Sequence, residues 1–188
     1  MSVKNIVIGV GNVLFKDEGV GIYAAKYLQQ NYDFDETTQI IDGGVLGFKL
    51  MTYFQEYENV IILDTVSIED EAGSIFRLPA DVLLGLGSYR KTAHEVEIVE
   101  MLEICSMLEK MANVVIIGII PKDIESVENS MTNEVLAKFP DFIDATLNEI
   151  KSLGVNFSKK DDVSVEYIID NFFKEQSFGN QIQAGICG

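Results

Sequence analysis

Three segments of this chain, residues 3–9, 60–64 and 114–120, are apolar almost throughout. A strand with apolar side chains on both sides has to be covered on both faces, which is typical of strands in parallel sheets. Amphipathic stretches with a helical period lie between these runs. The sequence therefore predicts an α/β fold with a mostly parallel sheet between layers of helices.

The remaining elements follow from the same patterns. Residues 38–42 are predicted to form a short strand and residues 73–78 an edge strand, with a turn after residues 83–87. Pro140 is expected to kink or divide the helix that contains it. Helices are predicted at 18–30, 46–57, 95–111 and 132–153, with inward-facing residues that include Tyr23, Leu28, Phe54, Leu102, Cys105 and Leu108.

The first predicted strand leads into a glycine-rich turn that lacks one feature of a phosphate-binding turn. A dinucleotide fingerprint needs a glycine three residues after Gly11, and Leu14 stands there. The turn instead carries Asp17 and Glu18, whose carboxylates repel phosphate. These acids favour a metal or a proton-transfer role, although acids in the first turn of a helix also complement its dipole.

Acidic residues follow three predicted strands. Glu18 comes after the first strand, Asp42 ends the second and Asp64 ends the third. The carboxyl ends of parallel strands form the usual active-site edge of an α/β sheet. A buried carboxylate is costly unless it is paired or liganded, so Asp64 is a candidate ligand, with a loop-capping role as the alternative.

The chain has one histidine, His94, at a predicted junction between a loop and a helix. An imidazole and two carboxylates are a reasonable ligand set for zinc, nickel or iron. The three residues do not have motif spacing, and a surface or helix-capping histidine is the alternative. Asp42 could also bind a ribose, which keeps a nucleotide site open.

Composition narrows the partners of the chain. A net charge of −16 disfavours nucleic acid and anionic membranes. We expect no secretory signal and no membrane insertion, because no apolar run approaches the length of a membrane helix. The two cysteines, Cys105 and Cys187, are not expected to form a disulfide framework, which fits a reducing cytoplasm.

Several of these motifs occur together in a known family. They are the Gly9–Asn12 turn with the Asp17–Gly21 segment, the Asp42-Gly43-Gly44 turn, the strand ending in Asp64, the single His94 and the Gly118–Pro121 segment. In this order and over roughly residues 3–153, the chain resembles the hydrogenase maturation endopeptidases. That family trims the C-terminus of the large subunit of [NiFe] hydrogenases.

The resemblance implies a three-layer α/β/α sandwich with a twisted, phosphorylase/hydrolase-like sheet. It also implies that Glu18, Asp64 and His94 bind nickel carried by the precursor subunit, with no tightly bound cofactor of the enzyme's own. Asp42 matches a segment linked to substrate recognition or cleavage. The family is sometimes grouped with aspartic peptidases, but this sequence has no paired-aspartate motif.

The resemblance does not extend over the C-terminal part. We predict a domain over residues 1–154 and an extension over 155–188, with a short helix at 163–174 and a mobile tail from residue 177.

Three functions are compared. The first is a nickel-gated endopeptidase, the second a nickel-sensing chaperone that holds the precursor uncut, and the third a nucleotide-binding protein that uses Gly9, Gly11 and Asp42.

Overall fold

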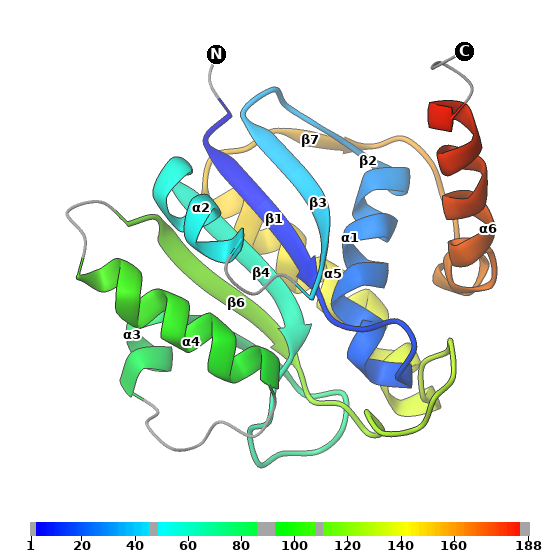
Figure 1. Cartoon of the computed structure of the whole chain (residues 1–188), viewed down its shortest axis with the longest axis horizontal. Coiled ribbons are helices and arrows are strands. Elements are labelled where there is room, and N and C mark those ends of the chain that lie inside the picture. The colour runs from blue at the N-terminus through cyan, green and yellow to red at the C-terminus, as the bar shows by residue number, and fades with distance from the viewer. Residues whose placement is uncertain (1–2, 46–48, 86–92, 108–110, 185–188) are drawn as a thin grey trace.

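A twisted sheet forms the middle layer of the protein. The computed structural model describes residues 3–45, 49–85, 93–107 and 111–184. Within them, five strands pair in the order β3 (Thr38–Gly44), β1 (Asn5–Val10), β4 (Asn59–Thr65), β6 (Asn113–Ile119) and β5 (Ile75–Pro79). The first four run parallel and β5 pairs antiparallel with β6 at the edge (Figure 1). The predicted mostly parallel sheet and its edge strand are confirmed.

Helices cover both faces of this sheet (Figure 1). One layer holds α1 (Val20–Asn31), α5 (Asn133–Ser152) and α6 (Val165–Ala184). The other holds α2 (Lys49–Glu56), α3 (Ala80–Gly85) and α4 (Ala93–Ser106). The fold is therefore the three-layer α/β/α sandwich that the family resemblance implied.

Alternating strand residues divide the core in two. On β1, Val7 packs toward α1 and α5, whereas Ile6 and Ile8 pack toward α2 and α4. On β4, Leu63 packs toward α1 and α5, and Ile62 packs toward α2 and α4. Because successive side chains of a strand point to opposite faces, a continuous apolar run supplies both cores at once.

A second, two-stranded sheet lies apart from the first. Its strands are β2 (Tyr32–Phe34) and β7 (Phe157–Lys159), which pair antiparallel. Tyr32, Phe34 and Phe157 also pack their rings against one another. The sequence analysis did not predict this sheet, because neither strand lies in an apolar run.

Other elements differ from the prediction in length. Helix α3 (Ala80–Gly85) was not predicted. Pro140 does not divide α5, which runs unbroken from Asn133 to Ser152. Helix α6 extends through residue 184, past the start of the predicted mobile tail. Leu108 and the tail residues 185–188 lie outside the described residues.

The first turns of α6 are part of the main core. Val165, Ile168, Ile169 and Phe172 are buried in the same cluster as residues of α1 and α5. The domain boundary at residue 154 stays a prediction, but the segment after it packs on the same layer. Cys105 is buried on α4, as predicted.

No helix within the described ranges combines the length and the apolar composition of a membrane span.

Candidate functional site at the carboxyl edge of the sheet

The strand order marks one point on the sheet edge. Strand β1 lies between β3 and β4. After β1 the chain returns to the sheet on one side of β1, as β3, and after β3 it returns on the other side, as β4. After β1 the chain passes to α1 on one face, and after β4 it passes by way of β5 to α3 and α4 on the other. In open α/β sheets, ligands bind beyond the strand carboxyl ends at such a switch point. The carboxyl ends of β1 and β4 are therefore the candidate site.

The glycine-rich turn after β1 folds tightly. Gly11 has a φ of +143°, and a Cβ built there would lie 1.9 Å from the backbone oxygen of Glu18. The backbone N–H of Asn12 donates to that oxygen at 3.2 Å. This backbone geometry is open to glycine, and it brings Glu18 back to the end of β1.

Glu18 lies in the short 3₁₀ helix η1 (Lys16–Gly19) that connects the turn to α1. Its side chain is half-buried. Gly21 is the second residue of helix α1, and a Cβ there would lie 2.1 Å from the backbone oxygen of Leu63. Glu18 is thus held close to the end of β4.

Asp64 lies near the end of β4 and is only 1% exposed. Its Oδ1 accepts a hydrogen bond from the Thr65 N–H at 2.7 Å. Since Leu63 faces α1 and α5, strand alternation places Asp64 on the side of α2 and α4. The predicted burial of this carboxylate is confirmed.

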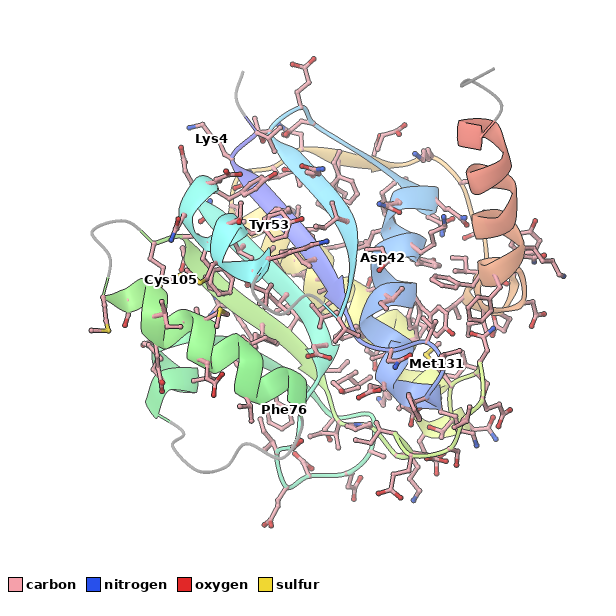
Figure 2. The ribbon with its side chains drawn as sticks, in the orientation of Figure 1. Lys4, Asp42, Tyr53, Phe76, Cys105 and Met131 are labelled. Carbon is pink, nitrogen blue, oxygen red and sulfur yellow. The ribbon has the colours of Figure 1, made fainter. Side chains whose placement is uncertain are left out.

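Asp42 is exposed at the end of β3 (Figure 2). It pairs in register with Gly9, and the register shifts at the next residue of β1. Its Oδ1 accepts from the Gly44 N–H at 2.9 Å, and the Gly44 carbonyl accepts from Gly11 N–H at 3.1 Å. The turns after β3 and β1 are therefore fastened together.

His94 belongs to the first turn of α4. The C-terminal end of this helix is connected to the start of β6, so α4 runs opposite to the strand and its first turn lies at the carboxyl edge (Figure 1). The imidazole itself is outside the described side chains. Among the described side chains, no three histidine, cysteine or acidic residues come together as a metal site.

The structure therefore brings the backbone positions of Glu18, Asp42, Asp64 and His94 to one edge of the sheet. Asp64 and α4 also share one face of it. Buried Asp64 and half-buried Glu18 lie at the carboxyl ends of the neighbouring strands β4 and β1 and offer the oxygen donors that a borderline divalent ion accepts.

Asp17 has a role that the sequence analysis did not assign. Its carboxylate is fully buried and accepts hydrogen bonds from Lys122 N–H, Asp123 N–H and both Thr132 N–H and Thr132 Oγ1. It therefore binds the loop between β6 and α5 rather than the start of α1. The only signal in the sequence was a second acid directly before Glu18.

Charged residues also join the turn to this loop. The hydrogen bond from Lys16 to Glu128 raises the pKa of Lys16. Hydrogen bonds from Ser126 and from the Glu125 N–H hold the pKa of Asp123 well below its usual range. Both side chains are therefore charged at neutral pH. The ion pairs of Lys16 with Asp123 and Glu128 join the turn to the loop at the surface, in addition to the buried bonds of Asp17.

Solved structures share this architecture. The hydrogenase maturating endopeptidase HybD from Escherichia coli superposes with a TM-score of 0.77 at 24% identity, over 84% of this chain and 98% of that one. The solution structure of an endopeptidase from Escherichia coli gives 0.75 at 25% identity, over 85% and 99%. The fold is that of a group of peptidases.

Sequence comparison agrees. The family model described as "Hydrogenase maturation protease" matches residues 22–149. The hydrogenase 2 maturation protease of Escherichia coli is 26% identical over 80% of this chain and 92% of its own. The hydrogenase expression/formation protein HupD of Thiocapsa roseopersicina is 25% identical over 86% of this chain and 74% of its own. The chain belongs to the hydrogenase maturation protease family.

Proposed function

We propose that this protein is an endopeptidase that removes the C-terminal extension of a nickel-loaded [NiFe] hydrogenase large-subunit precursor. One observation carries the proposal. Residues from four distant segments, which the sequence singled out as acids and an imidazole, belong to one edge of the sheet in a member of a peptidase family. Of the three functions compared, family membership favours the peptidase.

The substrate's own nickel is the ion to be recognised. Glu18 and Asp64 supply oxygen ligands from the carboxyl ends of β1 and β4, and His94 supplies a nitrogen from the first turn of α4. Three protein ligands leave coordination positions for the groups that the precursor brings. We therefore expect weak nickel affinity in the isolated protein, and a metal that survives a chelator would contradict a substrate-borne ion.

Two routes to hydrolysis are compatible with this edge. In one, the substrate's metal polarises the scissile carbonyl or activates a bound water. In the other, the exposed Asp42 carboxylate acts as general base while the metal positions the precursor. Asp42→Asn separates them, because only the second route loses most of its rate.

The reducing cytoplasm is the compartment that we propose for the reaction. The buried free thiol of Cys105 is compatible with it.

The decisive experiment incubates the protein with precursor large subunit, with and without nickel, and reads the precursor's C-terminus by mass spectrometry. We expect a shortened product only with nickel. His94→Ala should lower the rate by more than about 100-fold, as expected for loss of a group at the reacting centre. Glu100→Ala, an exposed position on the same helix, is the matched control and should retain the rate.

Two results would count against the proposal. Full activity of His94→Ala would remove the nickel-recognition site. Binding of the nickel-loaded precursor without any change in its mass would identify a chaperone instead.

A further inference from the structure

The Asp17 carboxylate is surrounded by donors from a single loop. Oδ2 accepts from Lys122 N–H at 2.9 Å, Asp123 N–H at 3.0 Å and Thr132 Oγ1 at 2.9 Å. Oδ1 accepts from Thr132 N–H at 2.7 Å. Hydrogen bonds to a charged acceptor are the stronger kind, and this side chain is 0% exposed. Asp17 therefore ties both ends of the 122–132 loop to η1.

Backbone bonds reinforce the attachment. Lys16 N–H donates to the Glu128 carbonyl at 2.9 Å, and Asp17 N–H donates to the Asp123 carbonyl at 3.1 Å. Lys16 has a φ of +38°, a conformation that non-glycine residues seldom adopt and that the surrounding bonds must maintain. The turn conformation that precedes Glu18 thus depends on the loop.

The loop is in turn fixed to the body of the protein. Asn129 Nδ2 donates to the Ile169 carbonyl of α6 at 3.0 Å, and the Tyr23 hydroxyl of α1 donates to Asn129 Oδ1. Asp17 is therefore bound to a loop with its own support in α1 and α6, which makes the loop a fixed reference for η1.

From these contacts we propose that Asp17 is a positioning residue. It fixes the η1 turn against the 122–132 loop and so sets the place of the next residue, Glu18, at the carboxyl ends of β1 and β4. The inference rests on the proposed function only for the role of Glu18.

The test replaces Asp17 with asparagine and compares it with a matched variant at the other end of α1. Asp17→Asn turns one acceptor into a donor that faces other donors. Asn31→Asp does the reverse: Asn31 is also 0% exposed, and its Nδ2 donates to the Val163 carbonyl at 3.0 Å. Both changes are isosteric, and both loosen a buried attachment of the continuous η1–α1 segment.

Two measurements are made on each folded variant. We expect Asp17→Asn to lower kcat for precursor cleavage at least about tenfold with KM within about threefold, since misplacing a reacting group impairs the chemical step. Hydrogen exchange of residues 12–20 should rise about tenfold, since local opening becomes easier. Asn31→Asp should leave kcat and the hydrogen exchange of residues 12–20 within about twofold of the parent. It should lower the thermal midpoint about as much as Asp17→Asn does.

The proposal is overturned if Asp17→Asn retains the parent's kcat, or if kcat falls while residues 12–20 keep their protection. If the parent protein leaves the precursor uncut, the proposed function fails, and hydrogen exchange alone decides whether Asp17 fixes the turn. Should Asp17→Asn not fold, Thr132→Val takes its place, because it removes one of the four hydrogen bonds. Thr132→Val must then lower kcat, and Thr132→Ser, which keeps the hydroxyl, must retain the parent's kcat.

Discussion

The polar side chains at the two edges of the central sheet find their hydrogen-bond partners in different ways. At the amino edge, Asn5, Asn59 and Asn113 stand in register as the first residues of β1, β4 and β6. Asn113 Nδ2 donates to Asn59 Oδ1 at 3.4 Å, and Asn59 Nδ2 donates to Asn5 Oδ1 at 2.8 Å. Asn5 Nδ2 then donates to Thr38 Oγ1 at 3.4 Å. This asparagine ladder is neutral.

At the carboxyl edge, the polar groups are acids. An amide both donates and accepts, so neighbouring amides can satisfy one another, whereas a carboxylate only accepts. Asp17 finds its donors in a distant loop, and Asp64 accepts from its neighbour Thr65. The amides of the amino edge thus satisfy one another, while the carboxylates of the carboxyl edge need hydrogen-bond donors or positive charge from other parts of the chain or from a ligand.

The largest effect should come from Asp64→Asn. This isosteric change removes a buried negative charge, and we expect precursor cleavage to fall by more than about 100-fold. The free energy of unfolding should stay the same or rise by about 1 kcal/mol, because burying a charge is costly. Urea unfolding and a cleavage assay on the same preparation test both. A large loss of stability would mean that Asp64 maintains the sheet, as the asparagines do.

Asn5→Ala should give the opposite result. It removes the centre of the contacts between Asn59 and the Thr37–Thr38 segment, so we expect a loss of about 2 kcal/mol in the free energy of unfolding. The cleavage rate should remain within about twofold of the parent when the protein is folded, because additivity holds for distant sites. Impaired cleavage by fully folded protein would show that the two edges are coupled.

The smallest effect concerns Asp35, near the amino edge. Hydrogen bonds from the Thr37 hydroxyl and the Asn156 N–H lower the pKa of Asp35. A folded-state pKa below the unfolded value gives stability that is present above about pH 4 and is lost as the pH falls through the folded pKa. Asp35→Asn should therefore be less stable than the parent at neutral pH, with the difference shrinking in acid.

Urea unfolding at several pH values measures this difference. Glu36→Gln, which removes the neighbouring exposed carboxylate, is the control. A gap for Asp35→Asn that is constant with pH would contradict the expected titration.

Sequence patterns predicted the sheet because the apolar runs are unambiguous. The strand at 114–120 and the helix that begins after Thr132 appear within about a residue of their predicted ends. The β2–β7 pair could not be predicted, since its strands are three residues each and about 120 residues apart in the chain. Nor could the length of α6, whose apolar spacing weakens after Phe172 and Phe173.

The candidate site was predictable in its residue types and only partly in its construction. The acids that follow three of the predicted strands had to meet at one edge once the strands were parallel. The attachment of Asp17 to Lys122, Asp123 and Thr132 was not predictable, because three of its four donors are backbone N–H groups and the fourth is a hydroxyl, none with a distinctive sequence pattern. The side-chain geometry of His94 remains a prediction.

The contact between α1 and the sheet has a consequence for how such a site can diversify. A Cβ at Gly21 would lie 2.1 Å from the Leu63 oxygen and 2.4 Å from the Val10 oxygen, so helix and strands meet main chain to main chain. The spacing between α1 and the ends of β1 and β4 is therefore set by main-chain atoms that every amino acid shares. The side chains around these strand ends can therefore change to suit different precursors while the main-chain spacing stays constant.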